Sequence, residues 1–515
     1  MSDTAINDTL NALDERVIEF MNKHALSGMG VGVVQDGKLI YAKGFGLAEA
    51  KSKRPVTSET NFRIASISKT FTAIAVMQLW EQGKFKLDDP VNKYLKTYQV
   101  LHPDPNAPQV TIRHMLTHTS GIGEMRNRDD LIKGMLGLLS EKEFKKRVPP
   151  LDEYFSGLLA PDVYPDKKWA YANNAFATLG QLIEDISGEK FRDYMIEHVF
   201  DPLGMLHSDY TLSERVKDQL AQGYTMKKGK LEFVDYVEFP GLAAGTVMSS
   251  VNEMGVYLAA LMNGGANEHG SVIKPDTLKK MMTPHYHEHP NLGAMGLGFF
   301  LENLDGHQAA WHGGSLQGFN SALWVAPDDK LGVFMSANSN TRLIYHFGKA
   351  VLRSLMGLPD YDKRLPKPDV VNSPHLWKDM VGSYAPYKGF NSNARIWMNF
   401  GGEIEIYVEG SKLKMQALTG GYKKGIELYP VDKNDPLSFE NVTDGRLMQL
   451  AFLRNTEGFI DHLSISALSF YTFYKTPPRQ SLRYKMKMLK TAAIGLGIWF
   501  IAKRLFGRRK SSLKH

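Results

Sequence analysis

Residues 66–82 read SISKTFTAIAVMQLWEQ, and this stretch carries the clearest structural pattern in the 515-residue chain. Its apolar residues fall on every side of a helix, which is typical of a helix buried inside a domain; they are Phe71, Ala73, Ile74, Ala75, Val76, Met77 and Leu79. Gly83 is a natural end for this helix. Ser66 and Lys69 lie three residues apart at its head, so they share one helical face.

A serine and a lysine on one helical face form a candidate nucleophile–base pair. A serine hydroxyl is a poor nucleophile until a neighbouring base removes its proton. Burial disfavours the charged form of a lysine, so a buried lysine can serve as that base. Backbone N–H groups at the start of a helix can stabilise a developing oxyanion. The sequence therefore indicates Ser66 and Lys69 as candidate catalytic residues.

Two further segments carry groups that suit the same chemistry. Tyr171-Ala172-Asn173 precedes a predicted helix at about 174–187, and a phenol can move a proton while an amide can hold a carbonyl group. Taken alone, these residues are better explained by an ordinary pre-helix turn, with Asn173 or Asn174 as the N-cap. His312-Gly313-Gly314-Ser315 lies on a predicted strand, where paired glycines let a substrate backbone approach and an imidazole can donate a hydrogen bond.

Taken together, and in this order, the three segments resemble the serine β-lactamase and penicillin-binding-protein superfamily. The resemblance is to the branch with class C β-lactamases, D-amino-acid peptidases and related esterases. The superfamily signature is Ser-x-x-Lys with Ser-Asp-Asn and Lys-Thr-Gly; here Tyr-x-Asn replaces the second element and His-Gly-Gly the third. The resemblance covers about residues 10–355 and includes LTHTSGI at 116–122, YANNAFATLGQLIEDISG at 171–188 and HGGSLQGF at 312–319.

The resemblance implies a mechanism and a role for each matching residue. Ser66 attacks an acyl carbon and forms an acyl-enzyme, while Lys69 and Tyr171 handle the proton; either of the two could be the base. The substrate-binding and oxyanion groups are implied to come from Asn173 on the acyl side, the backbone N–H groups of Ser66 and Ser315, and the strand of His312, Gly313 and Gly314. The family implies neither a cofactor nor a metal.

His312 is a departure from the family pattern that bears on the substrate. β-Lactamases of the family use a lysine there to hold the antibiotic carboxylate, whereas a histidine is mostly neutral at pH 7. We therefore expect a serine hydrolase acting on peptide bonds that involve D-amino acids, or on small esters, in preference to an efficient β-lactamase. The alternative is a non-catalytic member that binds cell-wall peptides or serves as a scaffold; the intact Ser66, Lys69 and Tyr171 argue against it.

Other histidines allow a competing hypothesis. His114 and His118 lie in a segment that is structural in the family, so we do not expect them in catalysis. His285, His287 and His289 alternate along HYHEHP, and a strand would place all three on one face. Such a face could bind zinc and support an amidohydrolase. An exposed loop between prolines is the simpler interpretation, so no metal site is predicted.

The chain is expected to have an α+β fold with several parts. Residues 1–358 form a β-lactamase-like catalytic domain, for which the resemblance implies an antiparallel sheet with flanking helices and an all-α subdomain. Four prolines mark a linker at 359–375. Short alternating segments at 376–476 predict a small antiparallel β-barrel, similar to the lipocalin-like domain of some of the peptidases. Residues 477–515 form a basic tail.

Charge and composition limit the partners. The formal net charge is +7, but the last 37 residues hold 11 Lys and Arg and no acidic residue, so residues 1–478 carry −4. Nucleic-acid binding is therefore not expected. With no cysteine in the chain, thiol chemistry is excluded. No signal peptide is visible in the sequence.

The tail from Arg479 onward predicts contact with an anionic membrane surface. Lysines and arginines flank a 12-residue apolar run, TAAIGLGIWFIA, which is shorter than the ~20 residues of a membrane-spanning helix. The run could lie on a membrane or pass through it, and a helix docked on the barrel is the alternative. We thus expect a cytoplasmic or peripherally membrane-associated protein.

Overall fold

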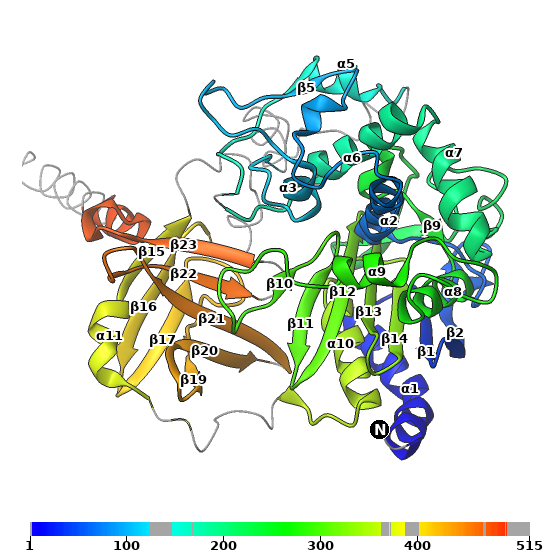
Figure 1. Cartoon of the computed structure of the whole chain (residues 1–515). Coiled ribbons are helices and arrows are strands. Elements are labelled where there is room, and N and C mark those ends of the chain that lie inside the picture. Colours follow the sequence, from blue (N-terminus) through cyan, green and yellow to red (C-terminus); the bar gives the residue numbers. More distant parts are fainter. Residues whose placement is uncertain are drawn as a thin grey trace, which may run out of the picture.

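The computed structural model describes residues 3–123, 147–166, 168–361, 370, 372–386, 401–443, 445–466, 470–489 and 491. It contains an N-terminal α/β part and a C-terminal β-barrel (Figure 1). Both were predicted from the sequence, and both are confirmed. The predicted linker at 359–375 includes residues 362–369 and 371, which lie outside the described residues.

The N-terminal part is built on one eight-stranded sheet in which every neighbouring pair is antiparallel. The first strand of the chain pairs with the last strand of this part. In spatial order the strands are β10 (Ala294–Met295), β11 (Phe300–Leu304), β12 (His307–Leu316), β13 (Phe319–Ala326), β14 (Leu331–Ala337), β1 (Gly28–Gln35), β2 (Lys38–Glu49) and β3 (Arg54–Pro55).

Helices cover both faces of this sheet. On one face α1 (Asp3–His24) packs with α10 (Ile344–Leu355), and on the other α8 (Val251–Met262) lies across β1 and β14. A Cβ atom at Gly30 or Gly32 of β1 would come within 2.7 or 2.9 Å of the Val251 side chain. The glycine-rich strand therefore allows close packing of the helix.

Helix α2 (Ser68–Glu81), preceded by the 3₁₀ turn η1 (Ala65–Ile67), is the buried helix predicted from residues 66–82. Every residue from Ser68 to Met77 is buried. It packs against α6 (Asn173–Ser187) in the helical subdomain. The remaining helices here are α3 (Ile112–Leu116), α5 (Leu151–Phe155), α7 (Phe191–Met195) and α9 (Pro275–Met281), with 3₁₀ or π turns at Val91–Lys93, Ile196–Phe200, Asp201–Leu203 and Leu242–Ala244.

Three small two-stranded sheets complete the N-terminal part. They pair β4 (Phe62–Arg63) with β9 (Met248–Ser249), β5 (Gln99–Val100) with β6 (Leu158–Leu159), and β7 (Gly223–Lys227) with β8 (Lys230–Val234). The first of these holds the chain just before η1, because the Ile64 N–H also donates to the Val247 carbonyl at 2.9 Å.

The C-terminal part is a nearly closed antiparallel barrel of nine strands. After α11 (Pro374–Met380), the strands run β18-β17-β16-β15-β23-β22-β21-β20-β19 in space. Burial alternates along them, as in the interior-facing Leu413, Met415 and Ala417 of β17. Their bounds are β15 (Gly382–Pro386), β16 (Ile404–Glu409), β17 (Lys412–Ala417), β18 (Ile426–Glu427), β19 (Tyr429–Asp432), β20 (Asp435–Thr443), β21 (Arg446–Arg454), β22 (Ile460–Ser466) and β23 (Phe470–Thr476).

The loop 285–291 of the N-terminal part makes polar contacts with the barrel. Asn291 donates to Asp435 at 2.8 Å, and the His289 Nε2 atom lies 3.4 Å from the same carboxylate. Thr472 of β23 donates to Glu288 at 3.1 Å. The segment that the sequence offered as a possible zinc site is thus a contact surface for the barrel.

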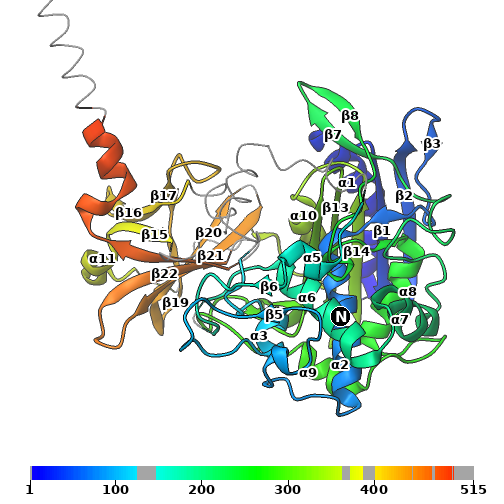
Figure 2. The ribbon, with the colours of Figure 1, turned by 90° about the horizontal axis from the view of Figure 1, so that it is seen from above.

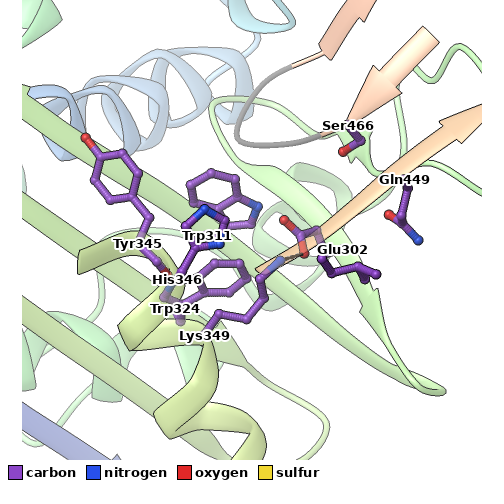
Figure 3. A pocket seen from close by; sticks show the side chains of 9 residues that line it. Glu302, Trp311, Trp324, Tyr345, His346, Lys349, Gln449 and Ser466 are labelled. Carbon is purple, nitrogen blue, oxygen red and sulfur yellow. Dashed lines mark hydrogen bonds and ion pairs between the residues drawn. The ribbon is translucent and has the colours of Figure 1, made fainter. Parts of the chain in front are cut away.

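A small cavity also lies between the two parts (Figure 3). An ion pair of 2.7 Å joins the buried Lys349 of α10 to Glu302 of β11. Tyr345 and His346 line the cavity from α10, and Gln449 from the barrel strand β21. The Tyr345 hydroxyl points away from the ion pair, toward β12 (Figure 3).

Beyond the barrel, the chain forms a short 3₁₀ turn (Pro478–Gln480) and a helical segment at 482–489. The fully buried Glu403 carboxylate accepts the backbone N–H groups of Leu482 and Arg483, which fixes the segment to the barrel. Apart from Thr491, the apolar run at 491–502 lies outside the described residues. Among the described residues, no helix combines the length and apolarity needed to cross a bilayer.

Candidate active site

The structure brings Ser66 and Lys69 together at the start of α2. The Lys69 Nζ atom lies 3.1 Å from the Ser66 Oγ atom. Lys69 is fully buried, whereas Ser66 is half-buried. A nucleophile that a substrate can reach, backed by a buried amine, is the arrangement that the spacing predicts.

A strained turn presents Ser66. The preceding residue, Ala65, has a φ of +51°, which is uncommon for a residue with a Cβ atom. The Ser68 hydroxyl donates to the Ala65 carbonyl at 2.6 Å and accepts the Val247 N–H at 3.0 Å. These bonds hold the turn in a conformation that the chain would otherwise avoid.

Three acceptors surround the Lys69 ammonium group. Besides Ser66, these are the Asn173 Oδ1 atom at 2.8 Å and the backbone carbonyl of Ala244. The aromatic rings of Tyr171 and Phe176 lie 4.9 and 5.6 Å from Nζ. The lysine is therefore fixed in place toward the serine, because each of its three N–H groups has an acceptor.

Tyr171 and Asn173 approach from the start of α6. Asn173 is the first residue of that helix and Ala172 is its N-cap, which makes no side-chain cap bond. The N-cap interpretation of Asn173 and Asn174 is therefore wrong. The Asn173 side chain instead reaches Lys69.

His118 determines the position of Tyr171. Its carbonyl oxygen accepts the Ala170 N–H at 2.8 Å, and its Nδ1 atom accepts the Ala172 N–H at 3.1 Å. The two rings lie 4.4 Å apart between centroids. His118 is fully buried with a φ of +58°. These contacts hold the segment that carries Tyr171, and the motif LTHTSGI was the only signal of them in the sequence.

The strand β12 forms the other wall of the site. Its pairing with β11 ends at Phe300–Trp311, so from His312 to Ser315 the described strand pairs with β13 on one side and faces η1 on the other. A Cβ atom at Gly314 would lie 2.0 Å from the Ile64 carbonyl oxygen. Glycine is therefore required at this position.

Side chains behind the strand fix its backbone. The Gly314 carbonyl accepts the Tyr345 hydroxyl at 2.8 Å and the Asn320 amide at 3.2 Å. The Tyr345 ring leaves no room for a Cβ atom at Gly313. Ser315 is exposed on this strand.

His312 is buried beside the same edge. Its Nδ1 atom lies 2.9 Å from the Gly313 carbonyl oxygen. Since a carbonyl oxygen only accepts, the Nδ1 atom carries a proton. The centroids of the His312 and Tyr171 rings are 6.3 Å apart.

The other histidines have separate partners. His285 contacts Arg113 at 2.8 Å, while His289 faces Asp435 of the barrel. His114 caps α3 through its Nδ1 atom, which accepts the Thr111 N–H at 3.2 Å. In the part of the chain that the structure describes, the one group of potential metal ligands with suitable spacing is Glu189, Glu197 and His198, outside this site.

Sequence reasoning missed the segment 243–247. It supplies the Ala244 carbonyl to Lys69 and the Val247 N–H to Ser68, and the Ala243 carbonyl accepts the Thr72 hydroxyl at 2.8 Å. Main-chain groups make these contacts to Lys69, Ser68 and Thr72, so no side chain marks the segment in the sequence.

This chain is similar to several known proteins. PbpX of Bacillus subtilis (strain 168), which is named as a penicillin-binding protein, is 28% identical over 298 residues, or 56% of this chain and 65% of its own length. The chain thus spans about two thirds of that relative. The octameric penicillin-binding protein homologue from Pyrococcus abyssi has a TM-score of 0.58 at 24% identity, covering 90% of this chain and 99% of that one.

A third similar protein and a family model complete the comparison. The D-alanine carboxypeptidase AmpC from Burkholderia cenocepacia has a TM-score of 0.54 at 22% identity, covering 69% of this chain and 99% of that chain. At this identity the two solved structures show the fold alone. Residues 13–353 match the model of the Beta-lactamase family. The chain belongs to the β-lactamase family.

Proposed function

We propose that this protein is a serine hydrolase that works through an acyl-enzyme at Ser66. The observation that carries the proposal is the 3.1 Å contact between the Ser66 hydroxyl and the buried Lys69 amine. Membership of the β-lactamase family supports it. A binding protein or scaffold would need neither this contact nor the strained turn that exposes the serine.

The mechanism follows from the positions of the groups. The Ser66 Oγ atom attacks the substrate carbonyl carbon, and its proton passes to Lys69 or Tyr171. The C–N or C–O bond then breaks, the leaving group takes up that proton, and water hydrolyses the acyl-serine. The N–H groups of Ser66 and Ser315 are assigned to the oxyanion, and such donors typically contribute ~3–4 kcal/mol each to lowering the barrier.

Lys69 must change protonation state if it is the base. With three acceptors around it, the amine is held as an ammonium group, which has no lone pair to accept a proton. It becomes a base only after losing a proton to an acceptor, a role that the phenolate form of Tyr171, whose ring centroid lies 4.9 Å from Nζ, would fill. Whether Lys69 or Tyr171 is the base, the same two residues move the proton.

The proposed substrates are peptides that contain D-amino acids, or small esters. The similar protein from Burkholderia cenocepacia is named as a D-alanine carboxypeptidase. His312 argues against efficient β-lactamase activity, because a neutral ring with its proton on Nδ1 offers no fixed cation to an antibiotic carboxylate. Substrates whose leaving group lacks a carboxylate suit this position better.

Active-site labelling tests the proposal. A fluorescent fluorophosphonate should label the wild-type protein, and Ser66→Ala should abolish the label. A panel of D-amino-acid amides, nitrophenyl esters and a chromogenic cephalosporin should show turnover of amides or esters above that of the cephalosporin. An unlabelled wild-type protein, beside a control hydrolase that does label, would favour the non-catalytic binding protein. Loss of turnover with a chelator would favour a zinc enzyme.

A further inference from the structure

The β7–β8 hairpin projects from the N-terminal part with its apolar side chains in solvent. Every residue from Met226 to Phe233 is exposed. Phe233 is 68% exposed, Met226 47% and Leu231 42%. Large apolar side chains at this exposure are unusual on a two-stranded hairpin, which has little stability of its own in water. An exposed apolar surface of this kind indicates a binding function.

The strand register places these side chains on one face. Met226 pairs with Leu231, and Tyr224 pairs with Phe233. Paired residues, and residues two apart on one strand, share a face of a β-ribbon. The hairpin therefore has a continuous apolar face of Met226, Leu231 and Phe233 beyond the buried Tyr224 at its base.

Lysines surround the tip of this apolar face. Lys227 and Lys230 extend from the opposite face, and Lys228 stands in the turn. A second basic turn lies beside the hairpin, because the Ala50 N–H donates to the Tyr224 hydroxyl at 2.7 Å. That turn, between β2 and β3, exposes Lys51 and Lys53. Among the acidic residues nearby are Glu49, Asp235 at the base of the hairpin, and Glu232, which pairs with Lys227 at 3.3 Å.

The C-terminal helical segment has the same combination of side chains. Met486, Met488 and Leu489 are 47%, 53% and 70% exposed, and Lys485 and Lys487 are exposed between them. Figure 2 shows the β7–β8 hairpin, the β2–β3 turn and this segment all projecting toward the upper edge of the view. The hairpin and the turn of the N-terminal part and the helical segment after the barrel thus project on the same side of the molecule.

We propose that this side docks on an anionic lipid bilayer, with the β7–β8 hairpin and the C-terminal segment as two separated contacts. Exposed aliphatic and aromatic side chains enter the boundary between headgroups and acyl chains, and neighbouring lysines reach anionic headgroups with their long stems. One such contact gives weak binding, and two contacts on one protein strengthen each other. The occupant is a lipid surface because the apolar groups lie in two narrow projections, which present no continuous area for a protein partner.

Vesicle co-sedimentation with the full-length chain tests the proposal. Phosphatidylcholine vesicles that contain phosphatidylserine should bind the protein, and vesicles of phosphatidylcholine alone should bind it much less. Leu231→Ser with Phe233→Ser should weaken binding about tenfold or more, as should Lys227→Gln with Lys228→Gln and Lys230→Gln. Neither set of residues belongs to the candidate active site, so hydrolysis of a small soluble ester reports whether the variants remain folded.

A matched control separates the hairpin from general hydrophobicity. Phe459, between β21 and β22 of the barrel, is 66% exposed, nearly the same as Phe233. Phe459→Ser should bind vesicles like the wild type. Equal binding by the hairpin variants and the wild type would overturn the hairpin contact, and equal binding to neutral and anionic vesicles would overturn the role of the lysines. A chain that stops at Pro478 should lose the second contact and bind more weakly; unchanged binding would refute the two-contact arrangement.

Discussion

Replacing Gly314 by alanine tests whether the close approach of β12 to the serine turn creates the active site. The added Cβ atom would lie 2.0 Å from the Ile64 carbonyl oxygen, 3.0 Å from its carbon and 3.3 Å from the Ala65 Cβ atom. An ordinary contact begins at about 3.4 Å, so strand and turn must separate by about 1.4 Å. The neighbouring atoms are mostly backbone, which no rotamer change can move. Ser66 and the β12 edge therefore shift relative to each other.

The expected effect on catalysis is larger than the effect on folding. Overpacking of this kind typically costs ~1–3 kcal/mol of unfolding free energy, which a domain of ordinary stability, ~5–15 kcal/mol, survives. A displacement of ~1 Å in an active site can reduce the rate about 10²-fold. We expect kcat/KM for a nitrophenyl ester to fall about 10²-fold, while urea unfolding shows a folded protein.

The control is Gly421→Ala in the barrel, where no atom lies within 4 Å of the new Cβ. It should leave kcat/KM and the unfolding midpoint unchanged. A folded Gly314→Ala variant with kcat/KM within about threefold of the wild type would refute the reasoning, because β12 would then not need to lie against the serine turn.

Four further predictions concern single residues. Ser66→Ala should abolish fluorophosphonate labelling and leave less than about one part in a thousand of the activity; higher residual turnover contradicts the nucleophile role. His312→Lys should raise kcat/KM for substrates with a free carboxylate relative to neutral esters, and an unchanged ratio would place His312 away from the leaving group. His118→Leu should lower kcat by leaving the Ala172 N–H unbonded, and His118→Asn, whose Oδ1 can accept that N–H, should restore part of it; equal loss in both argues against positioning. Burial, with the charges of Lys349 and Arg446, lowers the pKa of His346 to about 3 from an ordinary value of 6.5, so the stability that its neutral form contributes is complete above pH 6.5 and is lost as the pH falls toward 3. Between pH 6.5 and 5 the wild type should therefore lose up to about 2 kcal/mol more unfolding free energy than His346→Gln. Parallel pH profiles of unfolding free energy for the two proteins would exclude this contribution.

Local pattern was enough to predict the main elements of the fold. Helix α2 follows from a stretch in which apolar residues fall on every side of a helix. Such a pattern predicts a buried helix, and every residue from Ser68 to Met77 is buried. The barrel strands follow from alternation, as in β17. Each of these signals lies within a few residues of the element it specifies.

Contacts between distant segments were not predictable in the same way. The alternating histidines at 285–289 suggested a possible metal site, yet His285 meets Arg113, 172 residues away in the sequence, and Asn291 meets Asp435, 144 residues away. Nothing in the local pattern distinguishes a histidine that faces a carboxylate of the barrel from one that faces a metal. The role of such a histidine depends on the group that it contacts, and the fold determines which group that is.

The same distinction divides the active site into two kinds of residue. Ser66, Lys69 and Tyr171 would act through their side chains, so their types and spacing are visible in the sequence. Ala244 acts through a carbonyl oxygen that any residue possesses, and Gly314 acts through the absence of a side chain. A motif therefore identifies the reacting groups, whereas the geometry that holds Lys69 against Ser66 depends on main-chain positions. Substitution at Ala244 can leave its contact with Lys69 intact, but any side chain at Gly314 must displace the strand that borders Ser66.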